Sequence, residues 1–229
     1  MLEVFQARRG YRFGVETLLL CGFVEPGSGS MVDLGTGSGI IPLVLTRFGK
    51  AARAVGVEIQ PAMADRARRS AAHNGLAERV GIVEADLKAI DGVLPAAGFD
   101  LVTSNPPYRP AATGNVAAEP EKARAKHELL CTLDDVVAAA GRLLRPRGRF
   151  VVIVPPARLE DLLASCRSHG LRPARLRMIH GRAELPASHC LLEAVRGGRN
   201  QLVGERPLIV YENQERYTEE VQAMLYPGS

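Results

Sequence analysis

Short runs of valine, isoleucine and leucine alternate along the chain with segments whose apolar residues recur at helical spacing. This alternation is typical of repeated strand–helix–strand units, so we predict a doubly wound α/β fold with a mostly parallel sheet of about seven strands and an antiparallel hairpin at one edge. The predicted strands are Met31–Leu34, Arg53–Glu58, Val80–Glu84, Phe99–Ser104, Arg149–Val154, Leu171–His180 and Ser188–Val195, with a further short one at Pro207–Tyr211. The predicted helices are Ile40–Phe48, Pro61–Asn74, Leu133–Leu144 and Arg158–Ser168.

Length and composition fit a single globular domain. The chain has 229 residues, 24% charged and 46% hydrophobic. Its longest apolar runs, near Leu18–Val24 and Phe150–Pro155, are far shorter than the roughly 20 residues of a membrane helix. Met1–Val4 lacks the basic head of a signal peptide, so we expect a cytoplasmic protein. The four cysteines and five histidines have no metal-ligand spacing, and we expect no metal.

Positive charge is concentrated in the second half of the chain. Residues 141–206 contain 13 arginines and five acidic residues, whereas residues 1–140 contain 15 basic and 16 acidic ones. Forked guanidinium donors suit phosphate groups, which would indicate a nucleic acid partner. A solvated surface explains the same composition equally well, so charge alone does not decide between them.

A glycine-rich turn, Asp33-Leu34-Gly35-Thr36-Gly37-Ser38-Gly39, follows the first predicted strand. Glycines permit positive φ and let the backbone approach a ligand at a helix N-terminus. A dinucleotide turn would need its last glycine at position 40, which is Ile40, and Asp33 would repel a pyrophosphate. An acid beside this turn suits a cationic ligand group, such as the ammonium of a methionine moiety. The alternative is a tight turn that binds nothing.

Acidic residues also follow the next two strands. Glu58 ends the second strand, where it could accept hydrogen bonds from both ribose hydroxyls or cap the following helix. Asp86 follows the third strand, where it could accept from an adenine amine or cap a helix. Together with the glycine turn, the ligand-binding interpretation is favoured for both. All three acids fall at the carboxyl edge of the predicted sheet, where such folds bind ligands.

The tetrapeptide Asn105-Pro106-Pro107-Tyr108 ends the fourth strand. A rigid turn would explain its prolines but not its asparagine and tyrosine. It resembles motif IV of class I S-adenosylmethionine-dependent methyltransferases that modify planar, conjugated amino groups. In that family the asparagine oxygen and the following proline carbonyl accept the two amine hydrogens, and the aromatic ring stacks on the base. The resemblance implies a Rossmann-like fold, S-adenosyl-L-methionine as cofactor, and Asn105, Pro106 and Tyr108 as catalytic residues.

The amino-terminal residues indicate which group of these methyltransferases the chain resembles. Gln6, Gly10–Phe13, Glu16 and Leu18–Leu20 are similar to the segment that precedes the fold in the bacterial tRNA(Val) (adenine-N6)-methyltransferase family. The similarity continues through Val57–Gln60, Asn105–Arg109, Arg124, His127-Glu128, Leu208–Tyr211 and Tyr217-Thr218, so it covers essentially the whole chain. Glu16 stands where the family commonly has aspartate. The resemblance implies that residues 1–28 fold over the cofactor site and residues 29–229 form the methyltransferase domain, acting as a monomer or weak homodimer.

These arguments assign the site as follows. Cofactor contacts are expected from Tyr11, Arg12, Phe13, Asp33, Gly35, Gly37, Gly39, Glu58, Ile59, Asp86, Leu87 and Asn105. Substrate contacts are expected from Pro107, Tyr108, Arg109 and Arg124. Arg145, Arg147, Arg175 and Arg177 are expected to form part of a positive surface that borders the cleft at Asn105–Tyr108 and holds tRNA phosphates.

Several other activities share these motifs. Protein-glutamine N5-methyltransferases use the same Asn-Pro-Pro-Tyr but carry a substantial helical domain before the glycine turn, where this chain has about 30 residues. Ribosomal RNA guanine-N2 methyltransferases more often have phenylalanine at the position of Tyr108. DNA adenine methylation remains open, although no domain large enough to read a duplex sequence is visible. An idle RNA-binding scaffold would have no need of Asn105 and Tyr108. We therefore expect methylation of adenine N6 in tRNA.

Overall fold

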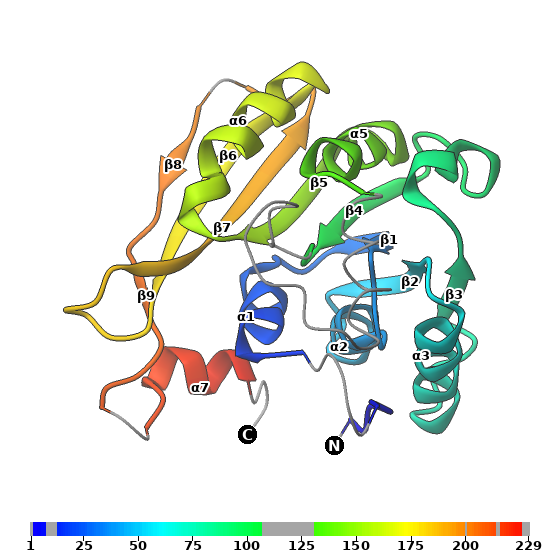
Figure 1. Cartoon of the computed structure of the whole chain (residues 1–229), viewed down its shortest axis with the longest axis horizontal. Coiled ribbons are helices and arrows are strands. Elements are labelled where there is room, and N and C mark those ends of the chain that lie inside the picture. Colours follow the sequence, from blue (N-terminus) through cyan, green and yellow to red (C-terminus); the bar gives the residue numbers. More distant parts are fainter. Residues whose placement is uncertain (1, 8–12, 107–130, 200, 214–215, 226–229) are drawn as a thin grey trace, which may run out of the picture.

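The computed structural model describes residues 2–7, 13–106, 131–199, 201–213 and 216–225. Its centre is one sheet in the order β3-β2-β1-β4-β5-β7-β6-β8, with β9 paired to β6 (Figure 1). The strands are β1 (Ser28–Leu34), β2 (Ala51–Glu58), β3 (Val80–Glu84), β4 (Phe99–Ser104), β5 (Leu144–Val154), β6 (Leu171–His180), β7 (Ala187–Arg196), β8 (Val203–Gly204) and β9 (Leu208–Ile209). Only β7 among these strands runs antiparallel to its neighbours, β5 and β6. The predicted mixed sheet is confirmed, and the two-residue strands β8 and β9 bring the number of strands to nine.

Helices cover both faces of this sheet (Figure 1). One face carries α1 (Val15–Phe23), α2 (Ile40–Arg47), α3 (Pro61–His73) and α7 (Glu219–Leu225); the other carries the short 3₁₀ helix η1 (Leu87–Gly92), α5 (Leu133–Leu143) and α6 (Leu159–Ser168). A second 3₁₀ turn, η2 (Pro156–Arg158), leads into α6. Within the described part of the chain, no helix is long and apolar enough to cross a lipid bilayer.

The two-sided cover explains why the strands are almost continuously apolar. In β5, Val151 and Ile153 pack into the core on the α1 face, whereas Val152 and Val154 pack into the core on the α5 face. Successive side chains of a strand point to opposite faces, so a strand buried on both sides needs apolar residues at every position. The same reason made these strands predictable from the sequence.

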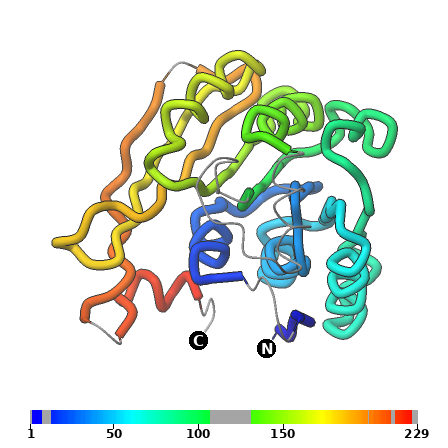
Figure 2. Tube along the Cα trace, viewed as in Figure 1, coloured from blue at the N-terminus to red at the C-terminus, as the bar shows by residue number. Residues whose placement is uncertain are grey.

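The two terminal helices were not predicted. Helices α1 and α7 pack against each other, and Figure 2 shows the blue and red ends of the chain side by side. A Cβ atom placed on Gly22 would lie 2.7 Å from Cγ of Met224, so glycine allows this close approach. Helix α7 has seven residues and a single buried side chain, Val221. A pattern that short carries no helical signal, and the contact with α1 supplies the missing stabilisation.

Candidate functional site

The carboxyl ends of three neighbouring parallel strands meet at one edge of the sheet. Strand β1 lies between β2 and β4, with Leu34 in register with Val57 and Asp33 in register with Thr103. The residues that follow these strands therefore lie near one another, as expected for the ligand-binding edge of a doubly wound sheet. The hydroxyl of Ser104 donates to the carbonyl oxygen of Leu34 at 2.8 Å and ties the ends of β4 and β1 together.

The glycine turn has the conformation that its sequence requires. Gly35, Gly37 and Gly39 have φ angles of 71°, 58° and 82°, in the left-handed region that disfavours side chains. A Cβ on Gly35 would meet nothing within 4 Å, whereas a Cβ on Gly39 would lie 3.1 Å from Cβ of Ala67 in α3. Gly35 therefore leaves space for a ligand, and Gly39 permits close packing between the turn and α3.

Asp33 is fully buried beneath this turn. Its Oδ1 accepts a hydrogen bond from the Thr103 hydroxyl at 2.7 Å, while its buried Oδ2 has no hydrogen-bond partner among the described residues. Burial raises the pKa of Asp33 to about 7, against the lowering effects of the nearby hydroxyls of Thr103 and Thr36. A buried carboxyl with one unsatisfied oxygen gains from a ligand that brings a donor or a positive charge. The site thus fits the cationic methionine moiety of S-adenosylmethionine.

Glu58 joins the glycine turn to the start of α3. Its Oε2 accepts from the backbone N–H of Gly37 at 2.8 Å, and its Oε1 accepts from the N–H of Gln60 at 2.9 Å. The bond to Gln60 is made to the N-cap residue of α3, and this helix has no side-chain cap hydrogen bond, so the capping alternative is not shown. Each carboxylate oxygen can accept more than one hydrogen bond, so the contacts described here leave the predicted ribose role open to test.

Asp86 caps η1. Its Oδ1 accepts from the N–H of Lys88 at 2.9 Å, so the capping alternative is realised, and its role toward adenine stays a prediction. Ile59 lies next to Glu58 with 36% of its surface exposed, which offers an apolar contact for a planar ring. Leu87 is half-buried at the start of η1.

Asn105 follows β4 and contacts α1. Its Nδ2 donates to the hydroxyl oxygen of Thr17 at 2.9 Å, and Thr17 is 2% exposed. Pro106 is buried beside it, and Phe13 packs against the core on the α1 face. Sequence reasoning missed Thr17; the only signal for it is a single hydroxyl within the apolar run of residues 15–23. Tyr11, Arg12, Pro107, Tyr108, Arg109 and Arg124 lie outside the described residues.

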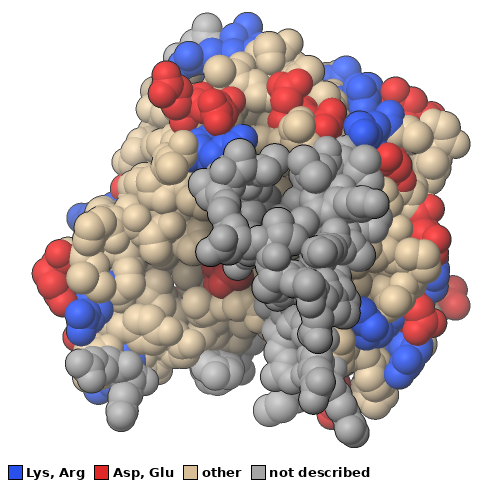
Figure 3. Space-filling model, in the orientation of Figure 1, with Lys and Arg blue, Asp and Glu red and all other residues tan. Residues whose placement is uncertain are grey.

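The four arginines expected beside the cleft do not gather there. Arg145 and Arg147 precede the parallel part of β5, at the opposite edge of the sheet from Asn105, and Nε of Arg145 pairs with Asp100 at 2.5 Å. Arg177 is 8% exposed and pairs with Glu220 at 2.7 Å. On the face shown in Figure 3, the lysine and arginine side chains of the described residues lie among aspartates and glutamates.

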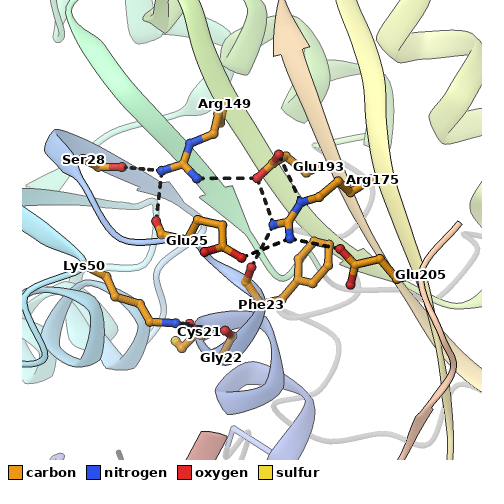
Figure 4. Close-up of polar contacts among 10 residues, drawn as sticks. All are labelled: Cys21, Gly22, Phe23, Glu25, Ser28, Lys50, Arg149, Arg175, Glu193 and Glu205. Carbon is orange, nitrogen blue, oxygen red and sulfur yellow. Dashed lines mark hydrogen bonds and ion pairs between the residues drawn. The ribbon is translucent and has the colours of Figure 1, made fainter. Parts of the chain in front are cut away.

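Arg175 is the centre of an ion-pair cluster (Figure 4). Its guanidinium pairs with Glu25, Glu193 and Glu205 at 3.2, 3.2 and 3.0 Å, and it lies 4.3 Å from the centre of the Phe23 ring. The positive charge of Arg175 is therefore balanced by carboxylates of the protein. The expectation that these four arginines form one positive surface beside the cleft is corrected, because Arg175 and Arg177 pair with carboxylates of the protein and Arg145 and Arg147 lie at the opposite edge of the sheet.

The described residues show neither a metal site nor a disulfide. No three His, Cys, Asp or Glu side chains gather as metal ligands among them. Cys21, Cys131, Cys166 and Cys190 are all free thiols, and burial raises the pKa of Cys131 to about 11. This thiol is thus protonated at neutral pH and a poor nucleophile.

Comparisons with known proteins agree with this geometry. A family model described as a methyltransferase domain matches residues 27–188. The tRNA1(Val) (adenine(37)-N6)-methyltransferase of Porphyromonas gingivalis is 32% identical over 181 residues, which cover 76% of this chain and 70% of that protein. The protein of the same name from Dickeya chrysanthemi is 32% identical over 200 residues, with coverages of 85% and 78%.

A solved structure supports the fold. A protein described as a predicted O-methyltransferase from Agrobacterium tumefaciens superposes with a TM-score of 0.73 at 24% identity, covering 91% of this chain and 94% of that one. Rossmann-like methyltransferase folds are therefore similar to this chain along nearly its whole length. Because the matched domain contains both the glycine turn and Asn105, and the curated relatives span most of the chain, this methyltransferase belongs to the tRNA1(Val) (adenine(37)-N6)-methyltransferase family.

Proposed function

We propose that this enzyme transfers a methyl group from S-adenosyl-L-methionine to the exocyclic N6 amine of an adenine in tRNA. The observation that carries the proposal is the position of Asn105. It follows β4, whose Thr103 is in register with Asp33 and hydrogen-bonded to it, and so lies beside the glycine turn. This position supports the proposal, because the side chain that would bind the target amine lies near the carboxyl that would receive the methionine moiety.

In this proposal, different residues at this edge of the sheet bind the cofactor and the target amine. The open side of Gly35, the unsatisfied Oδ2 of Asp33 and the carboxylate of Glu58 would hold the cofactor. The cofactor supplies an electrophilic methyl group on a sulfonium. The Asn105 side-chain oxygen and the Pro106 carbonyl would accept the two hydrogens of the amine, which draws its lone pair out of conjugation with the ring. The methylated nitrogen then loses its extra proton to water.

We also propose that residues 1–28 act as a segment over the cofactor site and residues 29–229 as the methyltransferase domain. The contact between Thr17 and Asn105 supports this division, because it joins α1 to the end of β4. The predicted stacking role of Tyr108 belongs to the same proposal.

The decisive experiment offers the enzyme four substrates separately: total tRNA, ribosomal RNA, DNA and release factor, each with labelled S-adenosylmethionine. We expect label in tRNA alone, recovered as N6-methyladenosine by nucleoside mass spectrometry. A tRNA1(Val) transcript with guanine in place of adenine 37 tests the nucleotide, and Asn105→Ala is the control with strongly reduced turnover. Label only in release factor, DNA or ribosomal RNA would overturn the proposal.

A further inference from the structure

The hydroxyl of Thr17 is bonded to the residue that the proposed function places on the target amine. Nδ2 of Asn105 donates to Oγ1 of Thr17 across 88 positions of sequence, at 2.9 Å. We infer that Thr17 is a positioning residue for Asn105, which holds the side-chain amide in the orientation that points Oδ1 toward the target amine. This inference rests on the proposed function, because it concerns the same amide.

The orientation of this amide decides whether the reaction proceeds. The two ends of an asparagine amide have nearly the same shape, but one accepts hydrogen bonds and the other donates them. A target amine presents hydrogens, so it binds Oδ1 and is repelled by the NH₂ group. By accepting from Nδ2, the Thr17 hydroxyl stabilises the end of the amide that faces α1 as the donor. The acceptor oxygen is then on the other side.

Helix formation does not explain the Thr17 hydroxyl. The N-cap of α1 is Gly14, and no side-chain cap is present at this helix start. The backbone N–H of Thr17 donates to the carbonyl of Gly14 at 3.3 Å, which leaves the side chain uninvolved in closing the first turn. A helix that needs only an apolar side chain at a buried position would accept valine there.

Helix α1, which carries Thr17, is held in position relative to the sheet by side chains from other elements. Three cations donate to backbone carbonyls at and just beyond its last turn (Figure 4). These bonds run from Lys50 to Cys21 and Gly22 at 2.8 and 2.9 Å, from Arg175 to Phe23 at 3.0 Å, and from Arg149 to Glu25 at 3.0 Å. Because Arg149 and Arg175 come from β5 and β6, a shift of α1 along the sheet would break bonds to separate strands. We call these bonds the α1 clamp.

The test compares two substitutions at position 17. Thr17→Val keeps the shape and removes the hydroxyl, whereas Thr17→Ser keeps the hydroxyl. We expect kcat for tRNA methylation to fall about 10–100-fold in T17V, the loss typical of a misplaced reacting group, and to stay near the wild-type value in T17S. KM for tRNA and the Kd for S-adenosylmethionine should stay within about twofold of wild type in both, because this amide acts after binding.

Thr46→Val is the matched control. Thr46 is a fully buried threonine of α2 whose hydroxyl has no hydrogen-bond partner among the described residues, so T46V removes a buried hydroxyl without removing a bond to Asn105. Its kcat should equal that of wild type. If T17V folds poorly by melting temperature, Thr17→Ala and the double variant T17A/N105A decide the matter: on the Asn105→Ala background, the loss of the hydroxyl should not lower the residual rate further.

Three outcomes would overturn the inference. An active wild type with T17V as fast as T17S removes the role of the hydroxyl and leaves the proposed function intact. The same conclusion follows if the fall in rate caused by Thr17→Ala adds in full to the fall caused by Asn105→Ala in the double variant. A wild type that methylates no tRNA adenine overturns the proposed function itself, and this inference with it.

Discussion

The carboxyl of Asp33 makes the stability of the empty protein depend on pH. Its pKa in the fold is about 7, against 3.8 for an ordinary aspartate. Between these values the folded carboxyl keeps a proton that the unfolded chain has lost, so the free energy of unfolding falls as pH rises through this window. Below the window both states are protonated, and above it both are ionised, so the dependence from this group ends there.

Asp33→Asn should therefore stabilise the cofactor-free protein, increasingly so from pH 4 to about pH 7 and by a constant amount above it. We expect the melting temperature of D33N to exceed that of wild type by about 2–4 °C for each kcal/mol recovered. The exposed Asp65→Asn is the control and should show no such trend. D33N should also bind S-adenosylmethionine more weakly, because a neutral amide cannot pair with an ammonium. A melting difference that stays constant with pH would contradict the raised pKa.

Substitution of Glu58 shows whether this residue binds the cofactor or stabilises the start of α3. The first role affects the Kd for the cofactor, and the second affects the melting temperature. If it receives the ribose, Glu58→Ala should weaken cofactor affinity by about 1.5–3 kcal/mol, the value of hydrogen bonds to a charged acceptor. Calorimetric titration measures this Kd. Glu84→Ala is the matched control, because this exposed acid lies in register with Glu58 on β3. An unchanged Kd in E58A, with a lower melting temperature, would assign Glu58 to the start of α3 alone.

At the scale of elements, burial on two faces made the sheet predictable and tertiary contact made the termini unpredictable. Strands β3, β4 and β6 have the bounds predicted from their apolar runs. Helix α7 depends on its contact with α1, and the partners of Arg175 come from residues 25, 193 and 205, so no local pattern reveals either. The candidate site shows the same contrast: the positions of Asp33, Glu58 and Asn105 at strand ends could be predicted from the sequence, whereas the contact of Thr17 with Asn105 arises from tertiary packing.

The α1 clamp should contribute measurably to stability. Lys50→Met keeps most of the aliphatic stem and removes two charge-assisted hydrogen bonds to the helix end. We expect the free energy of unfolding to fall by about 1.5–3 kcal/mol, with an unchanged m-value in urea. Lys88→Met, at an exposed position of η1, should change it by less than about 0.5 kcal/mol. Equal stability of K50M and wild type would show that the clamp is not stabilising.

At the scale of the whole molecule, the four described arginines Arg145, Arg147, Arg175 and Arg177 do not share one surface. Arg145 and Arg147 lie at the amino edge of the sheet, away from Asn105. We therefore expect the double variant R145Q/R147Q to keep the wild-type KM for tRNA and the same dependence of binding on salt. A salt slope reduced by about one for each arginine would show that tRNA phosphates reach that edge. R175Q/R177Q should instead lower the melting temperature, because Arg177 is buried and both arginines pair with carboxylates of the protein.

The α1 clamp also affects the stage of protein synthesis at which the site can form. Helix α1 lies near the start of the chain, but Arg149 and Arg175 contact it from 124 and 152 residues away. Contacts this distant close large loops and form late in folding. A growing chain leaves the ribosome from its amino end, so α1 emerges long before Arg149 and Arg175 can contact it. We therefore expect that an unfinished chain ending before β6 does not hold Thr17 and Asn105 together, even though it already contains both residues.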